Sequence, residues 1–158
     1  MRSSLVDSSV IIEALKGNPV AKRVLQSIEN NPKFTNPIIF SEVLFVFLKL
    51  VTGKSYLTLR GNPEEIGKHR DKLEKVYLYL RDNFSELPLT EEIEEKAFEF
   101  VLNYGLLPND ALILATAKFY DLTLVTLDFD FLDAAKSEGI EIVIGDSFGE
   151  TERVVQKG

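Results

Sequence analysis

Residues 108–133 decide the fold and read PNDALILATAKFYDLTLVTLDFDFLD. The opening Pro-Asn pair favours a helix start and places Asp110 in the first turn, where free backbone N–H groups stabilise an anion. A turn near Asp121 and the apolar run after it predict a buried strand over 122–127 that ends at Asp128. A helix followed by a buried strand indicates a parallel sheet, and ligands bind at the carboxyl ends of such strands.

The rest of the chain alternates short apolar segments with helical patterns in the same way. The predicted strands lie at 3–6, 33–35, 84–89, 122–127 and 140–144, and the main predicted helices at 8–16, 19–29, 37–51, 63–83, 91–104, 109–120 and 132–137. This alternation predicts one three-layer α/β domain over residues 1–146, with a central, mainly parallel sheet flanked by helices. An extended helical section is expected at 53–83, and the polar tail at 147–158 is expected to fray.

Composition narrows the classes of protein that remain. The 158 residues are 45% apolar, which suits a single globular domain, and the net charge of −7 argues against a protein that mainly coats a nucleic-acid backbone. The chain has no Cys, so disulfides, thiolate zinc sites and Cys nucleophiles are excluded. The longest apolar region, 37–51, is too short to span a bilayer, and the N-terminus lacks a signal-peptide layout. We therefore expect a cytoplasmic protein without a membrane segment.

Four carboxylates stand out by position: Asp7 after the first strand, Asp110 at a helix start, Asp128 after a late strand, and Glu42 inside an apolar helix. Two carboxylates ~5 Å apart repel by roughly 3 kcal/mol at an effective dielectric near 20. A cluster of them persists if it is protonated, open to water or occupied by a hard divalent cation such as Mg²⁺ or Mn²⁺. The alternative is that the Asp residues are ordinary caps and that Glu42 marks, with Lys49, the wet edge of its helix.

Four motifs resemble those of the PIN-domain ribonucleases, and most closely the VapC-type toxins of toxin–antitoxin pairs. They occur in the family's order across residues 2–144: LVDSSVII at 5–12, SEV at 41–43, NDALILATA at 109–117 and LVTLDFDF at 124–131. The resemblance implies a Rossmann-like PIN fold and an Mg²⁺- or Mn²⁺-dependent endoribonuclease. The implied reaction is in-line hydrolysis of RNA by metal-activated water, which leaves 5′-phosphate and 3′-hydroxyl ends.

The same resemblance assigns roles to individual positions. It implies that an acidic quartet holds the metal, that two hydroxyl residues orient this quartet, and that one further acid assists. On the matching positions these are Asp7, Glu42, Asp110 and Asp128, then Ser9 and Thr126, then Asp130. Asp133 has no clear counterpart and is interpreted as a helix cap. An antitoxin partner and a homodimer are also carried over as expectations.

The section at 53–83 departs from the family pattern because it is longer than in many small toxins. Its basic residues are interleaved with acids, and Lys68, Arg70 and Lys72 are candidates for contacts with RNA phosphates. The mixed signs also fit an ordinary solvated helix face.

Two other classes of function remain open. One is a non-catalytic PIN-like module for nucleic-acid binding or assembly. The other is a metal-dependent phosphatase, suggested by the Asp-Phe-Asp at 128–130 but disfavoured because haloacid dehalogenase-type phosphatases carry such a motif on the first strand. A Ser–His–Asp scheme is disfavoured because His69, the one His, lies in a polar segment.

Overall fold

The computed structural model describes residues 2–145 and 151–154. Its sheet has the strand order β3-β2-β1-β4-β5-β6, in which the first five strands are parallel and β6 runs antiparallel to β5. The strands are β1 Ser4–Val6, β2 Lys33–Thr35, β3 Ser85–Glu86, β4 Thr123–Thr126, β5 Ile142–Gly145 and β6 Thr151–Val154. The predicted α/β architecture with a mainly parallel sheet is confirmed.

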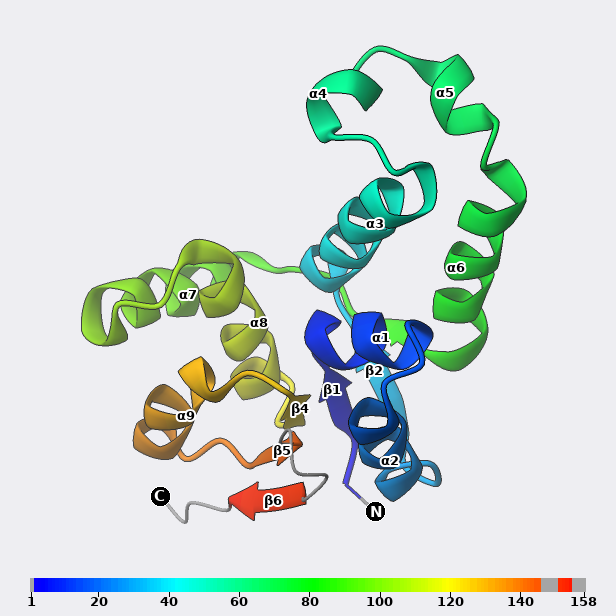
Figure 1. The fold of residues 1–158 in the computed structure, drawn as a ribbon. Coiled ribbons are helices and arrows are strands. Elements are labelled where there is room, and N and C mark those ends of the chain that lie inside the picture. Colours follow the sequence, from blue (N-terminus) through cyan, green and yellow to red (C-terminus); the bar gives the residue numbers. More distant parts are fainter. Residues whose placement is uncertain (1, 146–150, 155–158) are drawn as a thin grey trace.

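Helices cover both sides of this sheet (Figure 1). They are α1 Ser8–Leu15, α2 Pro19–Ser27, α3 Pro37–Thr52, α4 Tyr56–Leu59, α5 Pro63–Gly67, α6 Arg70–Asn83, α7 Glu91–Tyr104, α8 Pro108–Phe119 and α9 Leu132–Glu138, with a 3₁₀ turn at Phe129–Phe131. Figure 1 shows α1 and α2 on one side and α7, α8 and α9 on the other, with β1 and β4 between them. The central strands are buried on both faces, which explains why their sequences are mostly apolar, with Ser or Thr as their polar residues.

A buried asparagine joins the two helices that carry acids of the predicted site. The side chain of Asn36 caps α3 by accepting a hydrogen bond from the backbone N–H of Ile39 at 2.9 Å, and its amide donates to the Thr116 hydroxyl at 2.9 Å. Asn36 is fully buried, so this pair of bonds satisfies a polar side chain that would otherwise be costly to bury. The same residue thereby ties the start of α3 to α8.

Two predictions for local structure are wrong. The single helix expected over 63–83 is divided into α5 and α6, which are separated at Lys68 and His69. The break follows Gly67, a residue that weakens a helix interior. The tail expected to fray contributes β6, which pairs with β5; residues 146–150 and 155–158 of that tail lie outside the described residues.

No helix in residues 2–145 or 151–154 combines the length and the apolar composition needed to cross a bilayer.

Gly145 gives a stability prediction, because β5 approaches α2 very closely at this residue. A Cβ on Gly145 would lie 2.5 Å from Val24 Cγ2 and 2.9 Å from Leu127 Cδ2. We expect Gly145→Ala to lower the free energy of unfolding by about 1–3 kcal/mol and the Tm by roughly 3–10 °C. Gly67→Ala is the control, since its Cβ would meet nothing within 4 Å. Equal Tm values for the two variants would contradict the close packing.

Candidate active site

The candidate site lies where the strand order reverses. Neighbours β1 and β4 lead to crossovers that run to opposite edges of the sheet, and in open α/β sheets this switch point is where ligands bind. Asp7 directly follows β1, and Asp128 follows β4 two residues after its end. The backbone N–H of Asp7 donates to the Val125 carbonyl at 2.9 Å, which continues the ladder and fixes the two strand ends side by side.

Asp7 is buried, with 4% of its surface exposed, and its carboxylate is anchored on one side. The hydroxyls of Ser9 and Thr126 both donate to its Oδ2, at 2.7 and 2.8 Å. Each hydroxyl in turn accepts a backbone N–H: that of Leu127 at 3.1 Å for Ser9, and that of Asp128 at 3.0 Å for Thr126. Because these N–H groups occupy the hydroxyl lone pairs, both hydroxyl protons are directed at Asp7.

This arrangement suits an ionised carboxylate, which can only accept hydrogen bonds. Burial raises the pKa of Asp7, the bonds from Ser9 and Thr126 lower it, and the charge of Asp128 raises it further. The net direction of the pKa is upward from 3.8. Besides the two hydroxyls at Oδ2, the backbone of Ser8 also hydrogen-bonds to this carboxylate and lowers its pKa.

Glu42 lies in the second turn of α3, a helix that packs against α1. The Ser8 hydroxyl donates to Glu42 Oε1 at 2.9 Å, and the side chain of Asn109 also bonds to this carboxylate. Burial raises the pKa of Glu42, the Ser8 and Asn109 bonds oppose that rise, and the charge of Asp7 adds to it. The alternative was that Glu42 and Lys49 only mark the solvent-exposed edge of the helix. The bonds from Ser8 and Asn109 do not fit that alternative.

Asp110, in the first turn of α8, shows that the acids share one electrostatic environment. Its pKa is raised from 3.8 to about 6, first by burial and then by the negative charges of four other carboxylates. Those four are, in decreasing order of effect, Asp7, Asp128, Glu42 and Asp130. Five acids from four segments of the chain thus act on one another at the carboxyl edge of the sheet.

The turn after β4 orders the last two of these acids. Asp128 Oδ1 accepts the backbone N–H of Asp130 at 2.8 Å, which closes the 3₁₀ turn. Asp133 is exposed in the first turn of α9 and is not among the charges that raise the pKa of Asp110. Its placement at a helix start agrees with its interpretation as a cap.

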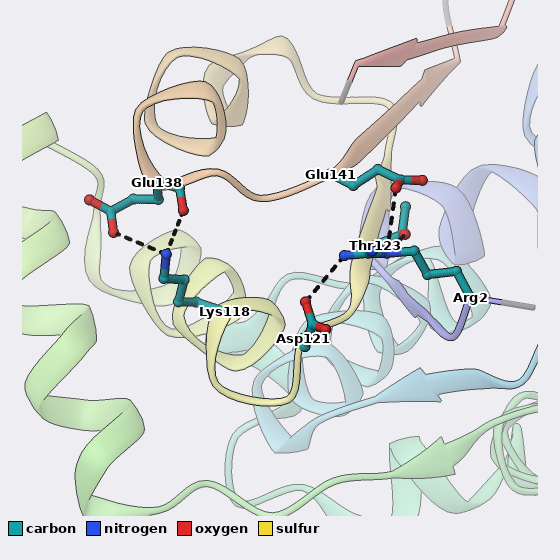
Figure 2. A network of polar contacts seen from close by, with 6 residues as sticks. All are labelled: Arg2, Lys118, Asp121, Thr123, Glu138 and Glu141. Carbon is teal, nitrogen blue, oxygen red and sulfur yellow. Dashed lines mark hydrogen bonds and ion pairs between the residues drawn. The ribbon is translucent and has the colours of Figure 1, made fainter. Parts of the chain in front are cut away.

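At the opposite edge of the sheet the acids have basic partners. Figure 2 shows Arg2 between two of them, at 3.2 Å from Asp121 Oδ1 and 3.4 Å from Glu141 Oε2, while its Nε also donates to Thr123 Oγ1. Nearby, Lys118 pairs with Glu138. Among the described residues, none of the five acids at the carboxyl edge forms an ion pair with Lys or Arg. The negative charge of the five acids is therefore not compensated by a Lys or Arg of the described residues.

Oxygen donors without Cys or His form the ligand set that Mg²⁺ and Mn²⁺ prefer. Within the described residues, no three acidic side chains already stand at the distances that would hold one ion. Mg²⁺ is commonly held by one or two carboxylates and retains several waters, so a complete cage of side chains is not required. The donor chemistry and the raised pKa values of Asp7, Glu42 and Asp110 fit such an ion.

Comparison with known proteins decides the family: the PIN domain matches residues 4–137, most of the chain. The chain belongs to the PIN-domain family. Ribonuclease VapC2 of Methanocaldococcus jannaschii is 39% identical over 139 residues, which cover 86% of this chain and 91% of the relative. The resemblance seen in the four motifs is thereby confirmed.

Two solved structures share the fold of this PIN domain. VapC20 of Mycobacterium tuberculosis, described as a toxin that cleaves the sarcin-ricin loop, has a TM-score of 0.62 at 16% identity and covers 83% of this chain and 94% of its own. A toxin–antitoxin complex from Klebsiella pneumoniae has a TM-score of 0.55 at 24% identity and covers 81% of this chain and 89% of its own. At 16% and 24% sequence identity, these two similarities support a shared fold.

Sequence reasoning missed two residues of the PIN-domain site. Ser8 and Asn109 both hold Glu42, although the sequence suggests for each only a place in a motif or a helix start. One signal was available in the sequence. Ser8 directly follows Asp7 and Asn109 directly precedes Asp110, and both residues lie at the start of a helix. The contacts themselves join residues 34 and 67 positions apart and cannot be seen in a linear pattern.

The basic candidates of the 53–83 section lie apart from these acids. Lys68 pairs with Glu65 at 3.1 Å, Arg70 pairs with Glu74 at 2.7 Å, and Lys72 is exposed. Figure 1 shows α4 and α5 at the far end of α3 from the sheet. Two of the three candidate charges are therefore already partnered on their own surface.

Proposed function

We propose that this PIN domain is an Mg²⁺- or Mn²⁺-dependent endoribonuclease that hydrolyses RNA phosphodiester bonds and acts as the toxin of a toxin–antitoxin pair. The observation that carries the proposal is the convergence of Asp7, Glu42, Asp110 and Asp128 at the switch point without a compensating Lys or Arg among the described residues. The relative named a ribonuclease, which is similar over most of its length, supports this activity.

Asp7, Glu42, Asp110 and Asp128 would hold the ion, with Asp130 as an auxiliary acid. When bound, such an ion lowers the pKa of a water and neutralises charge on the phosphate under attack. Ser9 and Thr126 orient Asp7 through its Oδ2, and Ser8 orients Glu42. These hydroxyl protons are committed to carboxylates, so the serines position acids and do not serve as nucleophiles. Water is then the attacking group, and the products carry 5′-phosphate and 3′-hydroxyl ends.

A cleavage assay separates this proposal from its alternatives. Purified protein is incubated with structured RNA and Mn²⁺, with EDTA and with an Asp7→Asn variant as controls. Metal-dependent cleavage that the variant lacks supports the nuclease. Binding of RNA without cleavage favours the non-catalytic module, and release of inorganic phosphate from a monoester favours a phosphatase.

A small antitoxin is the partner in this proposal, and the solved toxin–antitoxin complex with the same fold supports it. The far end of α3 offers a hollow of about 260 Å³ lined by apolar side chains such as Phe45 and Tyr56, with Lys49 and Arg60 at its edge. An apolar segment with acidic flanks would suit this hollow. A search of the neighbouring reading frames for a small protein, co-expression of any candidate with this chain, and a cleavage assay of the purified pair test the partnership. Full cleavage activity in a stable pair would contradict inhibition.

A homodimer is also part of the proposal. Phe98 and Leu102 of α7 are spaced by four residues and are 65% and 67% exposed, which leaves an apolar stripe on one face of that helix. Light scattering of the unaltered protein and of a Phe98→Asp variant tests the proposal. A monomeric mass for the unaltered protein at micromolar concentration would overturn it.

Neutralising Lys68, Arg70 and Lys72 together is expected to weaken RNA binding and to flatten its salt dependence. On single-stranded RNA, each phosphate that a basic side chain neutralises adds about 0.7 to the slope of log K against log salt. Because Lys68 and Arg70 already pair with Glu65 and Glu74, we expect the slope to fall by about 1 and not by the full value for three phosphates. A variant with Lys22, Arg23 and Lys33 neutralised is the charge-matched control. An unchanged slope in the first variant would end this assignment.

A further inference from the structure

Phe129 is an exposed aromatic side chain placed directly between two acids of the candidate site, Asp128 and Asp130. Its exposed fraction is 52%, and among the described residues no second aromatic ring and no cation contacts it. A single exposed apolar residue is ordinary on a protein surface. Phe129 differs from other exposed apolar residues in its position, because the acids on either side of it in the chain belong to the candidate site.

The backbone of the turn that carries Phe129 is held in place. The turn is fixed on one side by the Asp128 carboxylate, which accepts the Asp130 N–H at 2.8 Å, and by Thr126, whose hydroxyl accepts the Asp128 N–H at 3.0 Å. On the other side, the Phe131 side chain is 1% exposed and anchors the turn in the core. Phe131 occupies the inward position, whereas Phe129 is exposed on the surface of the same turn, which also carries Asp128 and Asp130. An aromatic side chain has only two χ angles, so it loses little conformational entropy when a ligand covers it.

We propose that Phe129 stacks against an unpaired nucleobase of the RNA, next to the phosphate at the acidic cluster. This inference rests on the proposed nuclease function and names how the site would recognise its substrate. The acids and the net charge of −7 repel phosphates, whereas a nucleobase is neutral and presents a π-face. Base–aromatic stacking is therefore a source of affinity that this surface can supply without a positive charge.

The stacking has a consequence for the substrate. A base inside a duplex is covered on both faces by its neighbours, while a base in a loop, a bulge or an end can be splayed onto an aromatic side chain. Phe129 would thus favour cleavage beside an unpaired nucleotide. Its contribution would be independent of salt, unlike that of any Lys or Arg contact.

The test compares Phe129→Ala with abasic substitution in the RNA. With the unaltered protein and Mn²⁺, one abasic site beside the cleaved bond is expected to lower kcat/KM by about 5- to 150-fold, the range for removal of one stacked base. Phe129→Ala is expected to lower kcat/KM on intact RNA by a similar factor, mostly through KM and equally at low and high salt. In that variant the abasic site should cause no further decrease, because the ring is already absent.

Two sets of variants make the result specific. Phe129→Tyr and Phe129→Trp keep an aromatic face and should retain the rate, whereas Phe129→Leu should not. Phe119→Ala is the matched control, since Phe119 is 47% exposed at the end of α8 opposite Asp110. Unchanged cleavage by Phe129→Ala, or additive decreases from the variant and the abasic site, would overturn the inference while leaving the nuclease intact. Absence of RNA cleavage and of Mn²⁺ binding in the unaltered protein would overturn both.

Discussion

Replacing Asp7 by Asn is expected to lower the rate of Mn²⁺-dependent RNA cleavage by at least about 10²- to 10³-fold, the effect of removing one well-placed electrostatic group from an active site. Asn keeps the shape of the side chain, and its carbonyl oxygen can still accept the hydroxyls of Ser9 and Thr126. The variant should therefore fold while losing the charge that a divalent ion requires. Single-turnover cleavage and Mn²⁺ titration, measured side by side, check both parts of this expectation.

Asp133→Asn is the matched control for Asp7→Asn. It also removes one negative charge, but Asp133 is exposed and does not contribute to the field at Asp110. The control should cleave RNA and bind Mn²⁺ like the unaltered protein. Cleavage by Asp7→Asn at the rate of this control would remove Asp7 from the ligand set and, with it, the basis of the proposed function.

Replacing Asp110 by Asn is expected to stabilise the metal-free protein at neutral pH. The folded pKa of Asp110 is about 6, above its ordinary value of 3.8, so between these values the folded state binds more protons than the unfolded state. Stability must then fall as pH rises from about 4 to about 6 and stay level above that range. Because Asp110 is only partly buried, solvent screens part of the interaction, and we expect a gain of about 1–2 kcal/mol for Asp110→Asn at pH 7 in EDTA.

Urea unfolding at pH 4 and pH 7 measures this difference. At pH 4 the carboxyl of Asp110 is protonated in the folded protein, and the two proteins should unfold at similar urea concentrations. At pH 7 the Asp110→Asn variant should be the more stable, and added Mn²⁺ should reverse the order by stabilising the unaltered protein. A variant that is less stable than the unaltered protein in EDTA at pH 7 would show that the acids do not repel one another there.

The sequence was sufficient for the parallel sheet and for the positions of the four acids along the chain, because both depend on local patterns. The mostly apolar run at 122–127 predicts a strand buried on both faces, and such strands are typical of a parallel sheet. Once the strand is parallel to the first one, Asp7 and Asp128 follow at the same edge. The placement of Asp110 and Glu42 beside them needed the family resemblance, since nothing local directs α3 and α8 to that edge.

Features that depend on tertiary partners were not predictable in the same way. The residues of β6, TERV at 151–154, lack the alternating apolar pattern of a strand and form one because β5 offers an unpaired edge. The separation of α5 from α6 depends on how each packs, and Gly67 alone was a weak indication. The bond from Ser8 to Glu42 joins two helices across a gap of 34 residues.

The order in which the acids occur along the chain has a consequence for synthesis. Asp7 and Asp128 flank the pairing of β1 with β4, and β4 is made only after more than two thirds of the polypeptide. A nascent chain on the ribosome, or a fragment from a prematurely stopped message, lacks both β4 and the last carboxylates. Such a chain cannot bring Asp128 and Asp130 beside Asp7. Fragments that end before β4 are therefore expected to be inert towards cellular RNA, and a nascent chain should become active only when translation is nearly complete.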